Sequence, residues 1–395
     1  MSLYTIPLSR RTERMKSSAI REMLKHLSVP GMISLAGGNP APESFPTALF
    51  QELLERTLTR HGHHALQYSE TEGFAPLRTS LSGWLQKQGI PADPSNLLVT
   101  NGSQGALDAL AKVLLDSGTP IAVESPTYLG ALQAFMPFNP SFHTLTSDEQ
   151  GVLPESLEAY WQQHPEGIAY LMPTFQNPSG RTMSLLRRQQ IAALLQRSSG
   201  LMIEDDPYSA LRFDGSPLPA LISLCPEKVV YLGTLSKVFA PGMRIGFCIA
   251  PAQLFPWLVK AKQGTDLHTS TLAQALASEY VNSGSLDLQI PKILSLYRTR
   301  RDAMQQALAM HFPSCFTWSR PEGGMFFWLQ GPPGFDAQQM LPCALQAKVA
   351  YVAGNAFSPH ADADCLRSLR LNFTLPNEDQ ISQGIARLAN IFGKA

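Results

Sequence analysis

Residues 201–208 read LMIEDDPY, an apolar run that ends abruptly in three carboxylates, a proline and a tyrosine. A short apolar run without polar alternation is typical of a strand that is buried on both faces, as in a parallel sheet covered by helices. Ligands of open parallel sheets bind at the carboxyl ends of the strands. The polar residues after 201–203 are therefore candidates for a binding site, although Asp206-Pro207 alone is more typical of an acidic turn.

Similar apolar runs recur between Asn96 and Pro251, and helix-like stretches separate several of them. We predict strands at residues 97–99, 121–123, 168–172, 201–203, 229–232 and 245–250, and helices at 104–115, 129–135 and 185–196. This alternation predicts an α/β fold with a mostly parallel sheet that is covered on both faces.

The C-terminal part has a different pattern, which is typical of an α+β domain. From about Pro291 the sequence predicts a helix at 292–311, strands at 323–329, 349–352 and 369–373, and a last helix that ends near Phe392. We therefore expect a large domain at residues 45–290 and a small domain at 291–395. The N-terminal segment 1–44 is expected to pack on the small domain.

Composition excludes several classes of protein. Of the 395 residues, 44% are hydrophobic and 16% are charged, and the 31 basic residues balance the 31 acidic ones, which argues against a nucleic-acid or anionic-membrane binder. The N-terminus is basic but has no apolar core of signal-peptide length, and no apolar run reaches the roughly 18 residues of a membrane span. Five scattered cysteines without CxxC pairing favour free thiols in the cytoplasm over disulfides or a zinc site.

A lysine follows the predicted strand 229–232, in the loop GTLSK at 233–237. Such a lysine could form an imine with a carbonyl cofactor. Arg244 comes just before the next strand, where its charge would lower the pKa of Lys237 and help to hold a phosphate dianion. A lone lysine in a loop is, however, more often a solvated surface charge.

Two other strand ends carry groups that suit a pyridine ring. Asp205 could pair with a protonated pyridine nitrogen, which lets the ring absorb the electrons of a substrate carbanion. Tyr208, together with Asn177 in the loop PTFQNPSG at 173–180, could donate to a phenolic oxygen of the ring. The Asn-Pro-Ser-Gly sequence alone is more typical of an ordinary turn.

The loop TNGSQG at 100–105 lies between a predicted strand and a predicted helix. Free N–H groups at a helix start suit a phosphate, and glycines let the backbone approach it closely. Helix capping by Ser103 is the alternative. Tyr128 follows the strand 121–123, where its ring could stack on a cofactor.

The order of these motifs resembles that of pyridoxal-phosphate-dependent aminotransferases of fold type I, class I/II, over nearly the whole chain. Within that group the chain most resembles the branch of 2-aminoadipate/kynurenine aminotransferases and MocR-like regulators. The narrower resemblance is carried by ISLAGGNP at 33–40, LQY at 66–68, EDDPY at 204–208 and RIGF at 244–247. It implies an aspartate-aminotransferase-like fold, with a mostly parallel seven-stranded sheet in the large domain, and pyridoxal 5′-phosphate as the cofactor.

The resemblance also implies a role for each motif residue. Lys237 is the lysine that forms the imine and shuttles the proton between the substrate Cα and C4′ of the cofactor. Asp205 pairs with the pyridine nitrogen, Tyr208 and Asn177 hold the phenolic oxygen, and Tyr128 stacks on the ring. The phosphate ligands are Ser103, Gln104, Thr234, Ser236 and Arg244.

Substrate binding is implied for Arg370, in LRLNF at 369–373, because its guanidinium fork suits the α-carboxylate. Asn177, Gly38 and Arg21 are implied to line the substrate site. Arg21 could meet a distal carboxylate or simply cap an N-terminal helix. Asn39 and Asn355 depart from the usual residues of the family, which leaves the substrate open.

Tyr68 resembles the tyrosine that reaches the cofactor site of the neighbouring subunit, which implies a homodimer with shared active sites. We expect ping-pong transamination between an amino acid and a 2-oxo acid such as 2-oxoglutarate. A lyase, decarboxylase or racemase with the same cofactor is the main alternative; a transcriptional regulator or a non-catalytic module fits less well. We expect no metal, since His61, His63 and His64 are typical of a surface cluster.

Overall fold

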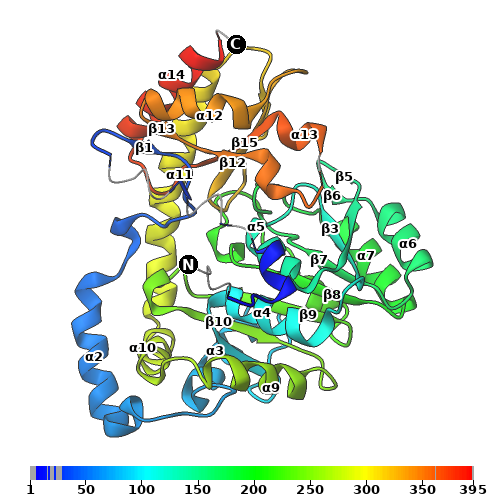
Figure 1. The fold of residues 1–395 in the computed structure, drawn as a ribbon. Helices are drawn as coiled ribbons and strands as arrows, with labels where there is room; N and C mark the ends of the chain where they lie inside the picture. Colours follow the sequence, from blue (N-terminus) through cyan, green and yellow to red (C-terminus); the bar gives the residue numbers. More distant parts are fainter. Residues whose placement is uncertain (1–5, 16, 18–21, 24–28, 361, 394–395) are drawn as a thin grey trace, which may run out of the picture.

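The large sheet has seven strands in the order β2-β10-β9-β8-β7-β3-β4 (Figure 1). The structure is a computed structural model that describes residues 6–15, 17, 22–23, 29–360 and 362–393. In this part of the chain the strands of the sheet are β2 (Leu97–Asn101), β3 (Pro120–Glu124), β4 (Ser141–Leu145), β7 (Ile168–Leu171), β8 (Leu201–Asp205), β9 (Val229–Thr234) and β10 (Ile245–Ile249). Strand β10 runs antiparallel to both of its neighbours, and the β9-β8-β7-β3-β4 pairs are parallel. The expected α/β fold with a mostly parallel sheet is confirmed.

Every apolar run predicted as a strand in the large sheet forms one, with small shifts at the ends. Strand β4 was not predicted, because it lies at the edge of the sheet and only the last of its five residues, Leu145, is buried. An edge strand does not need a continuous apolar run, since only part of it faces the core.

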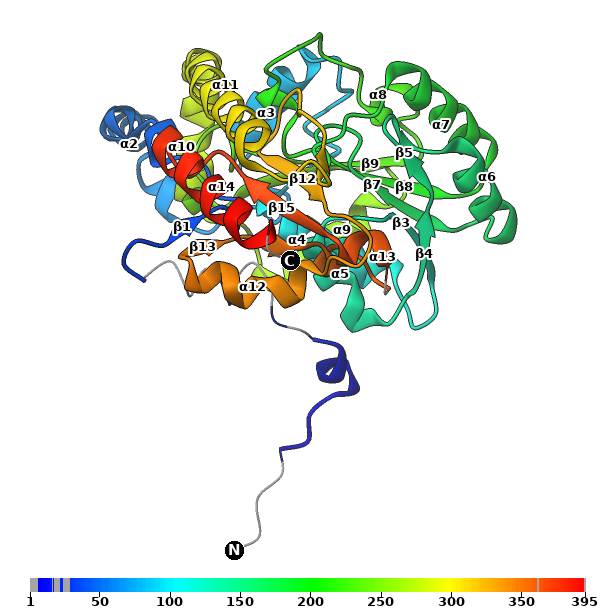
Figure 2. The same ribbon diagram turned by 90° about the horizontal axis from the view of Figure 1, so that it is seen from above.

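Helices lie on both sides of the large sheet (Figure 2). Helix α4 packs on β2, β9 and β10, whereas α7 packs against α6 and α8, and α10 against α2 and α3. The helices of this part are α2 (Thr47–His61), α3 (Ala75–Gln86), α4 (Gly102–Leu114), α5 (Leu129–Phe135), α6 (Pro154–Gln163), α7 (Leu185–Arg197), α8 (Leu221–Leu224), α9 (Phe255–Asp266) and α10 (Thr271–Asn282). The short strands β5 (Ser147–Asp148) and β6 (Gly151–Val152) form a separate antiparallel pair.

A second, four-stranded sheet in the order β11-β12-β15-β14 forms the C-terminal part. Its elements are β11 (Thr317–Trp318), β12 (Phe326–Gln330), β14 (Val352–Ala353), β15 (Ser368–Asn372), α11 (Ser285–His311), α12 (Ala337–Gln346), α13 (Ala363–Leu366) and α14 (Glu378–Phe392). The predicted segment 349–352 divides into β13 (Val349–Ala350) and β14, which belong to different sheets.

Helix α11 begins at Ser285 and not at residue 292, with Pro291 inside it. Proline removes one helical hydrogen bond and usually ends a helix. Here the helix continues because Leu286 before the proline and Ile293 after it are both buried, so packing outweighs the lost bond.

The segment before Ser44 joins the C-terminal part through backbone hydrogen bonds. Strand β1 (Ile33–Ser34) pairs in parallel with β13, and the N–H of Leu35 donates to the carbonyl of Ala350 at 2.8 Å. The N–H of Asn372 in turn donates to the carbonyl of Leu35 at 2.7 Å. These bonds fix the residues that lead into Gly38, next to the ends of the large sheet.

No helix within the described ranges combines the length and apolar character needed to cross a membrane.

Candidate active site

A cavity of about 610 Å³ lies at the carboxyl ends of β8 and β9 and is bordered by β12 and β15 of the small sheet. It is lined by most of the residues that the sequence predicted: Gly38, Ser103, Gln104, Tyr128, Asn177, Asp205, Tyr208, Thr234, Ser236, Lys237, Arg244 and Arg370. Asn39 also lines it, whereas Asn355 is exposed. Arg21 lies outside the described residues. Tyr68 does not line this cavity; it is 78% exposed and packs edge-on against His268.

Asp205 ends strand β8 with one carboxylate oxygen bound and the other free. Its Oδ2 accepts a hydrogen bond of 2.7 Å from the hydroxyl of Tyr170, and its Oδ1 is buried and has no partner among the described residues. Burial, opposed by the Tyr170 hydrogen bond, raises the pKa of Asp205 to about 7. A buried, unpaired carboxylate oxygen is costly. A cationic donor in the cavity would therefore stabilise the ionised form of Asp205.

Lys237 follows β9, and its amine points into the same cavity. Nζ donates a hydrogen bond of 3.0 Å to the carbonyl of Gly38. Burial, followed by the positive charges of Arg370 and Arg244, lowers the pKa of Lys237 to about 8. The neutral amine, which is the nucleophilic form, is therefore a much larger fraction of Lys237 at neutral pH than of an ordinary lysine.

Arg370, on β15, carries a positive charge that is fully buried. Its Nη1 donates to Oδ1 of Asn177 at 2.8 Å, and its Nη2 donates to the carbonyl of Ala36 at 2.7 Å. The Asn177 amide donates onward to the hydroxyl of Tyr208 at 3.4 Å. Burial lowers the pKa of Arg370 to about 10, and in the described part of the chain no carboxylate forms an ion pair with it. An incoming carboxylate would supply the missing counter-charge.

The start of helix α4 and Arg244 form a positively charged end of the cavity. Arg244 has a left-handed backbone conformation with φ of 56°, and its Nη2 donates to the carbonyl of Asn101 at 3.1 Å. A side chain at Gly246 would overlap the backbone of Gly102 and Ser103, so glycine there lets β10 lie against the start of α4. Free N–H groups, a helix dipole and a guanidinium together suit a phosphate.

These features fit pyridoxal 5′-phosphate. The unpartnered Asp205 oxygen suits a protonated pyridine nitrogen, the Lys237 amine suits an aldehyde, and the end formed by α4 and Arg244 suits the phosphate dianion. In the described residues no cluster of three or more His, Cys, Asp or Glu is arranged to hold a metal ion.

Among the residues at the site that were not predicted from the sequence, Tyr170 and Phe326 make the clearest contacts. Tyr170 orients Asp205 from the neighbouring strand β7, and a hydroxyl-bearing aromatic inside an otherwise apolar run was its only signal. Phe326 lies in the predicted strand 323–329, and no role in the site was predicted for it. It is buried, but it also lines the cavity, and the Arg370 guanidinium lies 4.1 Å from the centre of its ring. Cation–π contacts of this kind help to hold a desolvated arginine.

Known proteins are similar to this chain over nearly its whole length. Residues 30–388 match the family Aminotransferase class I and II. Aromatic-amino-acid aminotransferase 1 of Thermococcus litoralis is 44% identical over 382 residues, which cover 95% of this chain and 91% of that protein. The 2-aminoadipate transaminase of Thermus thermophilus is 38% identical, with coverage of 95% and 94%. A crystal structure of Pyrococcus horikoshii kynurenine aminotransferase in complex with PMP has a TM-score of 0.93 and 40% identity, covering 98% of this chain and 97% of that one.

The family and branch that the sequence motifs indicated are confirmed by these matches. The fold is the aspartate-aminotransferase-like fold type I. The chain belongs to the pyridoxal-phosphate-dependent aminotransferases of class I and II.

Proposed function

We propose that this enzyme transfers the amino group of an L-amino acid to a 2-oxo acid by ping-pong transamination, with 2-oxoglutarate as the acceptor. One observation carries the proposal: the unpartnered Oδ1 of Asp205 shares a cavity with the amine of Lys237 and the unneutralised guanidinium of Arg370. These groups supply what the reaction needs. Asp205 is a counter-charge for a pyridinium, Lys237 is a base, and Arg370 is a partner for the substrate carboxylate.

The polar side chains around Asp205 would hold the cofactor ring. When bound, pyridoxal phosphate supplies an aldehyde that reacts with amines and a ring that withdraws electrons from the substrate Cα. Asp205 would keep the pyridine nitrogen protonated, in an orientation fixed by the hydroxyl of Tyr170. Asn177 and Tyr208 would donate to the phenolic oxygen, and Tyr128 would pack on the face of the ring. The phosphate would be held by Ser103, Gln104, Thr234, Ser236 and Arg244.

Lys237 would act as the general base. Its pKa of about 8 lies much closer to neutral pH than that of a solvated lysine, so a useful fraction of the amine is free to accept a proton. Nζ would take the proton that leaves the substrate Cα. The buried position next to Gly38 would keep water away from this transfer.

Arg370 would bind the α-carboxylate of both the amino acid and the oxo acid. We expect Arg370→Lys to raise KM for both substrates about 30- to 100-fold, because a lysine cannot reproduce a two-pronged contact with a carboxylate, and to lower kcat less. Steady-state kinetics would measure the change. The control is Arg367→Lys in the same segment, where the arginine pairs with Asp364 outside the cavity. Equal effects of the two substitutions, or an effect on only one of the two substrates, would argue against this role.

We further propose that the enzyme is a homodimer in which Tyr68 of each subunit completes the cavity of the other. Tyr68 is 78% exposed and lies outside the cavity of its own chain, close to the exposed Leu66 at 69%. Tyrosine is enriched in protein–protein interfaces, and a partner subunit would bury this exposed ring.

A hybrid dimer would test the shared site. We expect Tyr68→Ala to lower turnover about tenfold or more, because the tyrosine hydroxyl would no longer form a hydrogen bond to the charged cofactor in the neighbouring subunit. A hybrid of one Tyr68→Ala subunit and one Lys237→Ala subunit should recover about half of the wild-type rate, because one of its sites then has both intact residues. If Tyr68 acts on its own subunit, the hybrid keeps one site without Lys237 and one without Tyr68, and its rate stays at or below that of the Tyr68→Ala homodimer.

Product analysis would test the reaction itself. Incubation of the holoenzyme with an amino donor and 2-oxoglutarate should yield glutamate and the donor's 2-oxo acid in equal amounts. Release of ammonia or carbon dioxide, or racemisation of the donor, would instead identify a lyase, a decarboxylase or a racemase with the same cofactor. Lack of turnover with 2-oxoglutarate but turnover with another oxo acid would reject only the proposed acceptor.

The amino donor is proposed from the relatives, which are named for aromatic amino acids, 2-aminoadipate and kynurenine. Gly38 lines the cavity and would border the substrate, and Arg21 would meet a distal carboxylate if the donor carries one. Spectra of the half-reaction with a panel of donors, in wild type and in Arg21→Gln, would rank the donors. Selective loss of 2-aminoadipate and glutamate in the variant is the expected result.

We also propose that the chain is divided into an N-terminal segment 1–44, a large domain 45–290 and a small domain 291–395. In this division α11 runs from one domain into the other, since it contacts both α10 and α14.

A cytoplasmic location is proposed because all five cysteines are free.

A further inference from the structure

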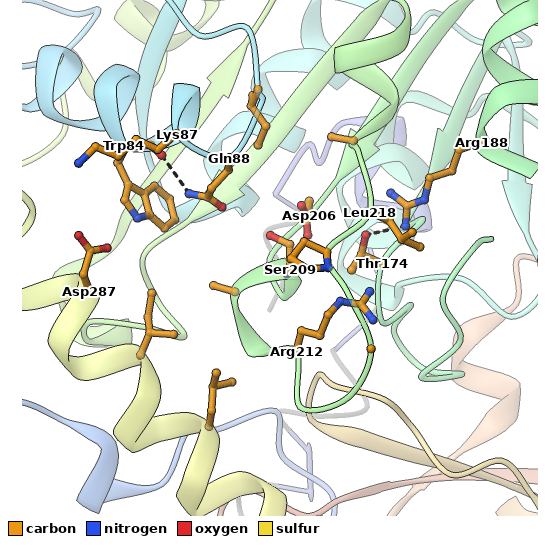
Figure 3. A pocket seen from close by; sticks show the side chains of 17 residues that line it. Trp84, Lys87, Gln88, Thr174, Arg188, Asp206, Ser209, Arg212, Leu218 and Asp287 are labelled. Atoms are coloured by element: carbon orange, nitrogen blue, oxygen red, sulfur yellow. Dashed lines mark hydrogen bonds between the residues drawn. The ribbon is translucent and has the colours of Figure 1, made fainter. Parts of the chain in front are cut away.

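A second cavity, of about 580 Å³, lies between α3, α11 and the segment that follows β8 (Figure 3). Asp206 lines this second cavity and Asp205 lines the first, so the two neighbouring carboxylates face different cavities. Asp206 has partners of its own: its Oδ1 accepts from the N–H of Ser209 at 3.0 Å, and its Oδ2 accepts from the hydroxyl of Tyr231 at 2.9 Å. The second cavity is therefore separate from the active site.

The second cavity has one apolar wall, and charged side chains line it at both ends, including Lys87 and Asp287 near Trp84 (Figure 3). Trp84 of α3 and Ile290 and Leu294 of α11 form the apolar wall. Arg188 and Arg212 lie on the opposite side of the view in Figure 3 from Trp84. The volume is in the range of about 300–1,000 Å³ that is typical of small-molecule pockets, which likewise combine apolar walls with a few polar groups.

Arg212 has a buried donor without a partner. Its side chain is 10% exposed and its guanidinium lies over the ring of Phe175, 4.7 Å from the ring centre. Nη1 donates to the carbonyl of Asp214 at 3.2 Å and to the carboxylate of Glu322 at 3.1 Å. Nη2 is buried and has no acceptor among the described residues. A buried donor of this kind costs free energy unless an acceptor satisfies it.

Arg188 places a second positive charge beside Arg212, and none of its hydrogen bonds goes to a carboxylate. It is fully buried, and its four hydrogen bonds all go to neutral oxygens: the carbonyls of Met183, Pro219 and Pro173, and the hydroxyl of Thr174. Within the described ranges no carboxylate forms an ion pair with it. Glu204, which lies outside the pocket, and Asp206, which lines it, offset part of this charge, and Glu322 is 58% exposed and therefore screened by solvent.

We propose that this pocket binds a small organic carboxylate with an aromatic or branched apolar body. The carboxylate accepts from Nη2 of Arg212, beside the positive charge of Arg188, and the body packs against Trp84, Ile290 and Leu294. A monoanion matches the single open donor better than a phosphate dianion would, because Asp206 lines the same pocket. The inference does not depend on the amino donor or acceptor of the reaction.

Binding of 3-phenylpropionate to the holoenzyme tests the proposal, since this acid has neither an amino nor an oxo group to react. The titration is done by calorimetry in the Arg370→Gln background, which removes the carboxylate partner of the active site. We expect saturable binding of one molecule per subunit, and at least tenfold weaker binding of the neutral 3-phenylpropanamide. Failure of the acid to saturate below about 10 mM, where even a weak pocket ligand should bind, would overturn the proposal.

Variants in the same background locate the binding. Arg212→Gln should weaken binding of the acid at least tenfold, whereas the matched control Arg320→Gln, an exposed arginine that lines a different cavity, should leave it unchanged. Ala210→Phe, which adds a ring inside the pocket, should block binding and serves as a second variant if Arg212→Gln does not fold. Unchanged binding in a folded Arg212→Gln, or in Ala210→Phe, would overturn the proposal.

Discussion

Replacing Lys237 by alanine is expected to lower the transamination rate by at least about 10⁴-fold, since a general base contributes about 10²- to 10⁴-fold and the covalent attachment of the cofactor is lost as well. The visible band of lysine-linked cofactor should disappear from the spectrum. The physical reason is that Nζ of Lys237 is the amine that the cavity holds with a pKa of about 8, positioned 3.0 Å from the carbonyl of Gly38. Single-turnover spectra with one amino acid would measure both effects.

Chemical rescue would separate a lost base from a damaged fold. Methylamine added to Lys237→Ala should restore part of the rate in proportion to its free-base concentration, since it supplies the missing amine. The control is Lys260→Ala, which removes an exposed lysine that packs on Trp257 of α9. A normal spectrum and rate in Lys237→Ala would reject the assignment of this lysine.

The second large effect is expected for Asp205→Asn, with kcat lowered about 10²- to 10³-fold, as for the loss of one preorganised electrostatic partner. Asparagine keeps the shape of the side chain but cannot hold a pyridine nitrogen in its protonated form. The Oδ1 of Asp205 is buried and unpartnered, so this oxygen is available to accept from a protonated ring nitrogen. The variant should still bind the cofactor, because Lys237 and the phosphate ligands are unchanged. Absorbance would measure cofactor content, and stopped-flow kinetics would measure the rate of the half-reaction.

Glu204→Gln is the matched control for Asp205→Asn. Glu204 is the preceding residue on β8, is equally buried and has a pKa raised to about 7 by burial, yet its carboxylate accepts from the N–H groups of Leu221 and Ile222 and lines neither cavity. Replacing Glu204 should lower the free energy of unfolding and leave kcat nearly unchanged. A similar loss of kcat in both variants would mean that Asp205 acts through the fold and not through the cofactor.

The motifs that could be predicted from the sequence are those in which strand and polar residue are adjacent in the chain. Asp205 directly continues an apolar strand, and Lys237 and Asn177 follow theirs within a few residues. By contrast, Tyr170 acts from a neighbouring strand, and its partner Asp205 is 35 positions away. Sheet order alone decides such a contact, and no local pattern encodes it. Phe326 was missed as a site residue for the same reason, since its part in the site depends on Arg370 from another strand.

Within the chain, the sequence by itself determined the α/β alternation, the parallel sheet and the chemistry of each strand end, because apolar periodicity and side-chain type are local properties. It also placed Asp205 and Asp206 next to each other after the predicted strand 201–203. Only the tertiary structure decided what each of them faces. Long-range packing placed Arg370 beside Asn177, 193 residues apart, on one side, and α3 and α11 on the other. The physical reason is that the free energy of these contacts comes from burial among distant segments, which depends on how the whole chain closes around them.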